Sequence, residues 1–141
     1  MADRVMSGVT FYRDEYGGPA ARPRDDSWSA IGSLMTGDVQ NVASWALRLL
    51  AYVDDVESGR SAGESWQGNS WDVAISKAGV HLQDLESDDW TGTHTLAETR
   101  AVLLEYLRFL LPGIEERRGE LAAWERDEGR EHPSRAAVET G

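Results

Sequence analysis

A change of hydrophobic period between residues 66 and 111 is the feature that most constrains the fold. Trp71, Val73 and Ile75 alternate with polar or small residues, which is the period expected for a half-buried strand. From residue 96 onward the apolar spacing becomes that of a helix instead. Both periods within one short stretch predict an α+β domain.

The predicted sheet is antiparallel and has two to three strands. A strand over residues 71–76 is followed by the short Gly-containing connection 77–79, so that 80–85 can return beside it. A third short strand over 90–94 is favoured by its threonines. Residues 61–65 have the composition of a polar linker.

The helix predicted over residues 96–110 has the clearest boundaries. Thr95 and Glu98 have the spacing of a capping box, in which each side chain satisfies a free backbone N–H of the other residue. Pro112 and Gly113 then stop the helix.

Two further helices are predicted, one on each side of this central stretch. The earlier one would start at an N-cap Thr36 or Asp38 and end before Gly59. Its predicted core stripe consists of Val42, Trp45, Leu49, Val53 and Val56. The later helix, over 114–127, is mostly charged and carries only a narrow apolar stripe, so we expect it to be peripheral.

The predicted fold is therefore α+β, with a short antiparallel sheet of two to three strands packed on two main helices and a peripheral C-terminal helix. We expect an N-terminal arm at residues 1–35, a single domain at 36–128 and a disordered tail at 129–141. The arm would be anchored by Phe11, Tyr12, Trp28 and Ile31.

Composition limits the partners that such a chain can bind. Its formal net charge of −11, from 25 acidic against 14 basic residues, opposes binding to nucleic acid or to an anionic membrane. It favours a basic protein partner, although acidity can also simply keep a protein in solution. The chain has no cysteine and no recognisable signal peptide, so we expect a cytoplasmic protein.

Asp84, Glu86, Asp88 and Asp89 place four carboxylates within six residues, between two predicted strands. Three interpretations stay open. The segment can be a solvated turn, a docking surface for a basic protein with Trp90 as its aromatic anchor, or a calcium or magnesium site. The alternation of three acids keeps the cation option open, but the spacing does not match an EF-hand loop.

Catalysis has little support in the sequence. His81 with Asp84, or His94 with Asp89, could form an acid–base dyad, whereas His132 lies in the expected tail. A catalytic site also needs a nucleophile or activated water and a group that stabilises developing charge, and no motif for these occurs. We therefore predict no enzyme activity and no cofactor, and interpret His81 and His94 as surface strand residues.

Tryptophans divide into core and surface candidates. Trp71 alternates with Val73 and should be buried, and Trp45 lies within a helical apolar stripe and is also predicted to be core. Trp66 and Trp90 are the candidates for partly exposed interface anchors, because Trp is over-represented at binding hot spots.

A family resemblance covers about a third of the chain, residues 66–111. It is carried by Gly68-Asn69-Ser70-Trp71, Gly79-Val80, Asp88-Asp89-Trp90, Leu96 to Glu98 and Tyr106 to Leu110. These segments resemble small bacterial immunity-type proteins, which are encoded beside polymorphic or contact-dependent toxins. The resemblance implies a stoichiometric inhibitor that occludes a toxin, commonly a cationic nuclease. It assigns no residue a role.

Taken together, these features predict a non-enzymatic acidic protein-binding module, most concretely an immunity or antitoxin protein. The predicted partner-binding residues are Asp84, Glu86, Asp88, Asp89, Trp90 and Trp66. One alternative is a structural or adaptor subunit that forms homo-oligomers through helix faces, including that of Trp124. The other alternative is a small metal-dependent enzyme.

Overall fold

The structure is a computed structural model, and it describes residues 7–140. Residues 1–6 of the predicted arm and Gly141 of the predicted tail lie outside the described residues. In chain order the elements are β1 (Val9–Arg13), β2 (Pro19–Pro23), the 3-10 helix η1 (Asp26–Trp28), α1 (Ser29–Ser33), the π-helix η2 (Leu34–Val39), α2 (Ala43–Ser58), β3 (Gly63–Gln67), β4 (Trp71–Ser76), β5 (Gly79–Asp84), β6 (Thr91–His94), α3 (Leu96–Leu110), α4 (Ile114–Glu128) and α5 (Arg135–Val138).

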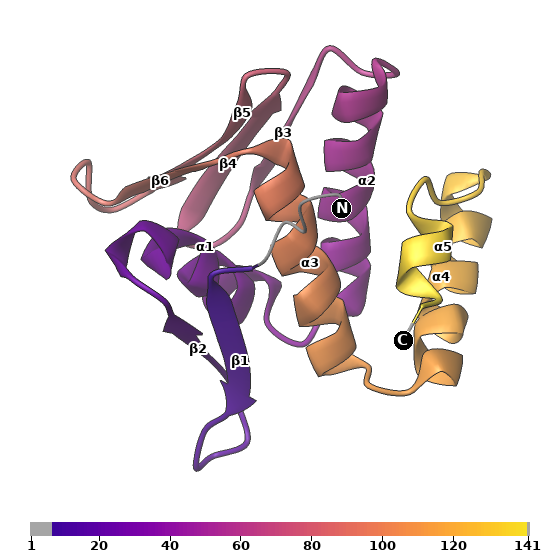
Figure 1. The fold of residues 1–141 in the computed structure, drawn as a ribbon, viewed down its shortest axis with the longest axis horizontal. Coiled ribbons are helices and arrows are strands. Elements are labelled where there is room, and N and C mark those ends of the chain that lie inside the picture. The colour runs from indigo at the N-terminus through magenta and orange to yellow at the C-terminus, as the bar shows by residue number, and fades with distance from the viewer. Residues whose placement is uncertain (1–6, 141) are drawn as a thin grey trace, which may run out of the picture.

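The elements are stacked in layers. Helices α2 and α3 lie side by side between the sheet β3–β6 and the helices α4 and α5 (Figure 1). The hairpin β1–β2 stands apart from that sheet, against α1 and α3 (Figure 1). No helix of the described chain is both long enough and apolar enough to cross a membrane.

The fold is α+β, but the predicted sheet of two to three strands with three helices is wrong. Between residues 7 and 140 there are five α-helices and two antiparallel sheets, one of two strands and one of four in the order β3-β4-β5-β6. The predicted sheet included neither the hairpin β1–β2 nor the strand β3, and β3 takes the place of the expected polar linker. It is an edge strand, and its residues alternate only between exposed and half-buried, so no apolar run marks it.

The remaining strands agree with the predicted hairpin. The pairs run from Trp71↔Asp84 to Ser76↔Gly79, which places Val73 opposite Leu82. Gly79 has a φ of 131° and lies close to the next strand, where an added Cβ would come 2.7 Å from the carbonyl oxygen of His94. Glycine is needed there for both reasons.

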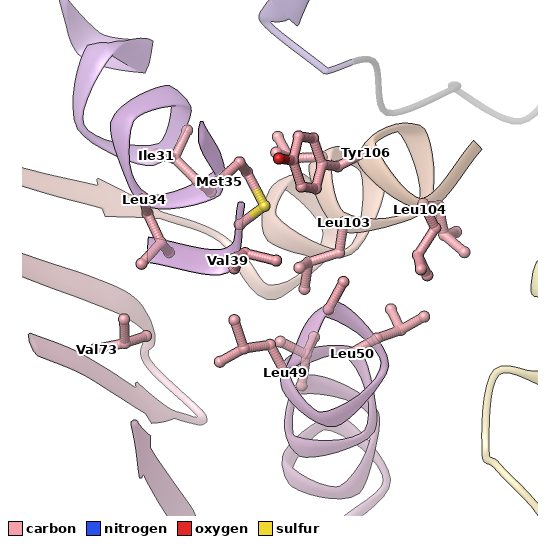
Figure 2. Packing of buried hydrophobic residues seen from close by; sticks show 14 of the residues in the cluster. Ile31, Leu34, Met35, Val39, Leu49, Leu50, Val73, Leu103, Leu104 and Tyr106 are labelled. Atoms are coloured by element: carbon pink, nitrogen blue, oxygen red, sulfur yellow. The ribbon is translucent and has the colours of Figure 1, made fainter. Parts of the chain in front are cut away.

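The core lies where the sheet, η2, α2 and α3 meet. Figure 2 shows Leu49 and Leu50 of α2 facing Leu103 of α3, with Val73 of β4 on the sheet side. Each fully buried Leu contributes about 1.5–3 kcal/mol relative to an exposed one. A single apolar cluster therefore connects the sheet to the helical layer.

The N-terminal segment contributes to this same core. Trp28 and Ile31 are buried as predicted, and Phe11 packs edge-on against Tyr106 with ring centroids 4.7 Å apart. Tyr12, another predicted anchor, is half-exposed instead. The predicted boundary after residue 35 falls inside η2, whose apolar residues are buried.

The first long helix begins later than predicted. Neither Thr36 nor Asp38 caps it, because both belong to the π-helix η2, and α2 starts only at Ala43. Between η2 and α2, Gln40 has a φ of 54°, and its carbonyl accepts a 2.6 Å hydrogen bond from the Tyr106 hydroxyl. A non-glycine residue with a positive φ of this kind costs about 1–3 kcal/mol. The surrounding packing must therefore hold Gln40 in this conformation where the chain leaves η2.

The buried face of α2 is also displaced from the predicted stripe. Trp45 is 40% exposed and Val42 is 37% exposed, so the prediction that they belong to the core is wrong. The helix is covered on several sides, by the sheet, α3 and α4, and its buried face is centred on Ala46, Leu50 and Val53. Its end at Gly59, with φ 84°, is confirmed.

The helix α3 has the predicted capping box, with both hydrogen bonds at 2.9 Å between Thr95 and Glu98. The helix α4 spans the predicted region after Pro112 and buries Leu121 and Trp124. The charged residues that surround these two positions account for the peripheral place of α4.

Residues 129–140 differ from the disordered tail that was predicted. They turn back along α4 and include α5, with Val138 and His132 buried. The buried Arg117 of α4 holds them by donating to the carbonyls of Val138 at 2.9 Å and Thr140 at 3.3 Å. These contacts are with backbone carbonyls, so the sequence pattern of the tail gave no sign of them.

Candidate partner-binding surface

The predicted acidic turn is the connection between β5 and β6. Asp84 ends β5, and its Oδ1 accepts hydrogen bonds from the backbone N–H groups of Glu86 and Ser87, both at 2.8 Å. Its own backbone N–H donates to the Trp90 carbonyl at 3.0 Å and closes the loop. Asp84 therefore shapes the loop, and its carboxylate is the least available of the four.

Glu86, Asp88 and Asp89 are exposed on this loop. Within residues 7–140, no cationic side chain lies within 4.0 Å of these carboxylates or of Asp84. Several acids elsewhere are paired, for example Asp55 with Arg130 at 2.7 Å. The loop thus carries an uncompensated negative charge.

Two apolar side chains lie on the same loop. Leu85 is 43% exposed and Trp90 is 40% exposed. The sequence pattern does contain a signal for Leu85, because it falls on the outward phase of β5 together with His81 and Gln83. Leu85 belongs with the predicted site residues, although it was not among them.

Trp90 rests on a rigid base. Its ring meets the ring of Trp71 edge-on, with centroids 4.9 Å apart. Trp71 is fully buried, and its indole N–H donates to the Ser33 hydroxyl at 3.2 Å. A half-exposed Trp on a fixed support loses little conformational entropy when it is covered by a partner.

Asp38 fixes the neighbouring loop at the same end of the sheet. This buried carboxyl group accepts from the backbone N–H groups of Ser70 and Trp71, at 3.1 and 2.9 Å. The Ser70 carbonyl in turn accepts from the Leu85 N–H at 2.8 Å. Asp38 therefore supports the acidic loop through the β3–β4 turn, a role that its sequence position did not suggest.

Trp66 is not close to the other predicted site residues. It lies on β3, in the cross-strand row that runs through Val73 and Leu82 to Gly92 on β6. Three strand spacings separate the ends of this row, or roughly 14 Å. Trp66 instead contacts Trp45 of α2, with ring centroids 6.0 Å apart.

The predicted histidine dyads are not formed, since neither pair lies within 4.0 Å in the described chain. His81 and Asp84 are three positions apart on one strand and so point to opposite faces. His94 is buried against Trp28, which corrects its prediction as a surface residue. Burial lowers the pKa of His94, and Glu98 at 3.6 Å opposes this shift in part.

A Ser, a His and an Asp do meet in the C-terminal segment. The Ser134 hydroxyl donates to Asp54, but His132 is occupied elsewhere. His132 Nδ1 accepts from the Ser134 N–H at 2.9 Å, and Nε2 lies 2.8 Å from the Leu47 carbonyl, to which it donates. Both ring nitrogens are used by the backbone, so this set does not activate the hydroxyl.

Trp124, which the self-association alternative places on an open helix face, is only 6% exposed. It is covered by His132, with ring centroids 4.4 Å apart. In the part of the chain that the structure describes, no group of three or more potential ligands could hold a metal ion. No family model, curated protein or solved structure matches this chain.

Proposed function

We propose that this chain is a non-enzymatic protein-binding module that uses the β5–β6 loop to bind a basic protein. The observation that carries the proposal is the composition of this loop, where Glu86, Asp88 and Asp89 lack a cationic partner in the described chain and lie between half-exposed Leu85 and Trp90. Its most concrete form is an immunity protein that covers a cationic toxin.

The two kinds of side chain would have different roles in binding. Carboxylates at the rim of an interface mainly accelerate association with a basic partner, and this acceleration becomes smaller as salt screens their charge. A Trp that enters a pocket mainly slows dissociation, and such an anchor is typically worth about 2 kcal/mol or more. The net charge of −11 adds attraction at long range.

The test is the association rate with the product of the neighbouring gene, measured over a range of salt concentrations. We expect 1:1 binding, and we expect Asp88→Asn with Asp89→Asn to slow association about fivefold at low salt and to reduce its salt dependence. Trp90→Ala should instead raise the dissociation rate.

The matched control changes Glu57→Gln and Glu105→Gln, two exposed acids on α2 and α3 that have no ion pair in the described chain. It alters the net charge by the same amount. Equal slowing by both double variants would show that only total charge matters, and an unchanged rate in the loop variant would refute the proposed surface.

A further inference from the structure

A second surface lies on the helical side of the molecule. A pocket of about 160 Å³ opens between α2 and α4. Helix α4 lies on the side of α2 that faces away from the sheet (Figure 1). The wall of the pocket includes the aromatic and charged side chains of Trp45, Arg48, Glu120, Trp124, Asp127 and Glu128. The volume suits the end of one side chain and is too small for a drug-sized ligand.

Two indole rings form the aromatic part of the wall. Trp45 is half-exposed and is held edge-on by Trp66 of β3. Trp124 is buried, and its indole N–H has no hydrogen-bond acceptor among residues 7–140. A buried donor of this kind is uncommon.

The charged part of the wall is predominantly acidic. Three carboxylates, of Glu120, Asp127 and Glu128, face one guanidinium, that of Arg48, which leaves a net charge of −2. Arg48 pairs with Glu128 at 3.8 Å. Neither Glu120 nor Asp127 has a cation within 4.0 Å in the described part of the chain.

We propose that this pocket binds the side chain of one arginine of a partner protein. A guanidinium is planar, so it can stack on an exposed indole such as that of Trp45 while it donates to carboxylates such as Asp127. This inference does not rest on the proposed function, because the pocket and the β5–β6 loop share no residue.

The probe is N-acetyl-arginine-methylamide, titrated into the full chain labelled with ¹⁵N. We expect saturable shifts of the Trp45 and Trp124 indole signals, assigned from Trp→Phe variants, with a dissociation constant on the order of 1–10 mM. The citrulline derivative has the same shape without the charge and should not bind. The lysine derivative should bind several-fold more weakly, because an ammonium cannot stack.

Variants separate the pocket from general electrostatic attraction. Glu120→Gln with Asp127→Asn should weaken the probe about tenfold at an unchanged melting temperature. Asp88→Asn with Asp89→Asn changes the net charge equally in the β5–β6 loop and should leave probe binding unaltered. Arg48→Gln removes the opposing cation and should strengthen binding.

Any of three results would overturn the proposal. These are indole signals that do not move, equal shifts with the arginine and citrulline derivatives, and equal weakening by the two double variants. Equal affinity for the lysine derivative would overturn the assignment to arginine. Each result leaves the test of the β5–β6 loop untouched, since that test uses a different partner and different variants.

Discussion

Asp38 and Gly68 are far apart in sequence but in close contact next to the candidate surface. The Asp38 carboxyl group reaches the Ser70 and Trp71 amides only because residue 68 has no side chain. A Cβ at residue 68 would come 2.3 Å from Asp38 Oδ2 and 2.8 Å from Asp38 Cβ. The glycine is therefore required by close approach.

Gly68→Ala should lower the free energy of unfolding by about 2–4 kcal/mol, because the methyl group displaces a buried carboxyl group from its hydrogen-bond donors. Urea denaturation measures this loss. Gly37→Ala, in η2, is the matched control, since its Cβ would meet nothing within 4 Å. A loss below about 0.5 kcal/mol at Gly68 would contradict the interpretation of Asp38 as a tightly held support.

At the scale of elements, the signals that predicted correctly were local ones. The alternation of apolar and polar residues in β4 and β5 lies within a few neighbouring residues, and so does the capping box of α3. Patterns of this length depend little on the rest of the fold, so they predict the folded structure correctly. The acidic loop was placed correctly for the same reason. The start of α2 was not, because Asp38 has its hydrogen-bond partners at residues 70 and 71 rather than in the next turn of a helix.

Thr95→Ala should cost about 1 kcal/mol of stability, because it removes the acceptor of the Glu98 N–H at the start of α3. Thr95→Ser keeps the hydroxyl group and should remain within about 0.5 kcal/mol of the parent protein. Chemical denaturation of the three proteins side by side gives the comparison. Similar losses for Ala and Ser would show that the methyl group of Thr95, rather than the cap, stabilises the helix.

At the scale of the whole molecule, the contacts that were not predicted are those between segments far apart in sequence. Arg117 binds carbonyls of the last turn of the described chain, and Arg130 reaches back to Asp55. The edge strand β3 has no apolar run because one of its faces is exposed. Periodicity shows which residues share a face of a helix, but it does not show how many other elements pack against that helix. Trp45 was therefore predicted to be a core residue.

The stability of the molecule should fall as the pH drops below about 6.5, the ordinary pKa of histidine. Burial lowers the pKa of His132, with a further contribution from Arg130, while the hydrogen bond to the Leu47 carbonyl and the carboxylates of Glu125 and Asp55 oppose the shift. The unfolded chain therefore binds the proton at a higher pH than the folded chain. The contribution of neutral His132 to the free energy of unfolding is complete above pH 6.5, and it is lost as the pH falls toward the pKa of the folded state.

Denaturation curves between pH 5 and pH 8 check this prediction. His132→Gln should flatten the pH dependence and leave only the part that arises from His94, whose pKa burial also lowers. His81→Gln is the control, because His81 is exposed on the outer face of the sheet. An unaltered pH profile in the His132 variant would refute the assignment.

The two tryptophan pairs have an optical consequence. Indole rings at 4.9 and 6.0 Å, crossed at 74° and 63°, couple their electronic transitions and give a paired band in circular dichroism. One pair lies under the acidic loop and the other beside the α2–α4 pocket. The protein thus has a built-in pair of chromophores at each proposed contact surface, and replacing one Trp of a pair by Phe assigns the part of the signal that comes from that surface.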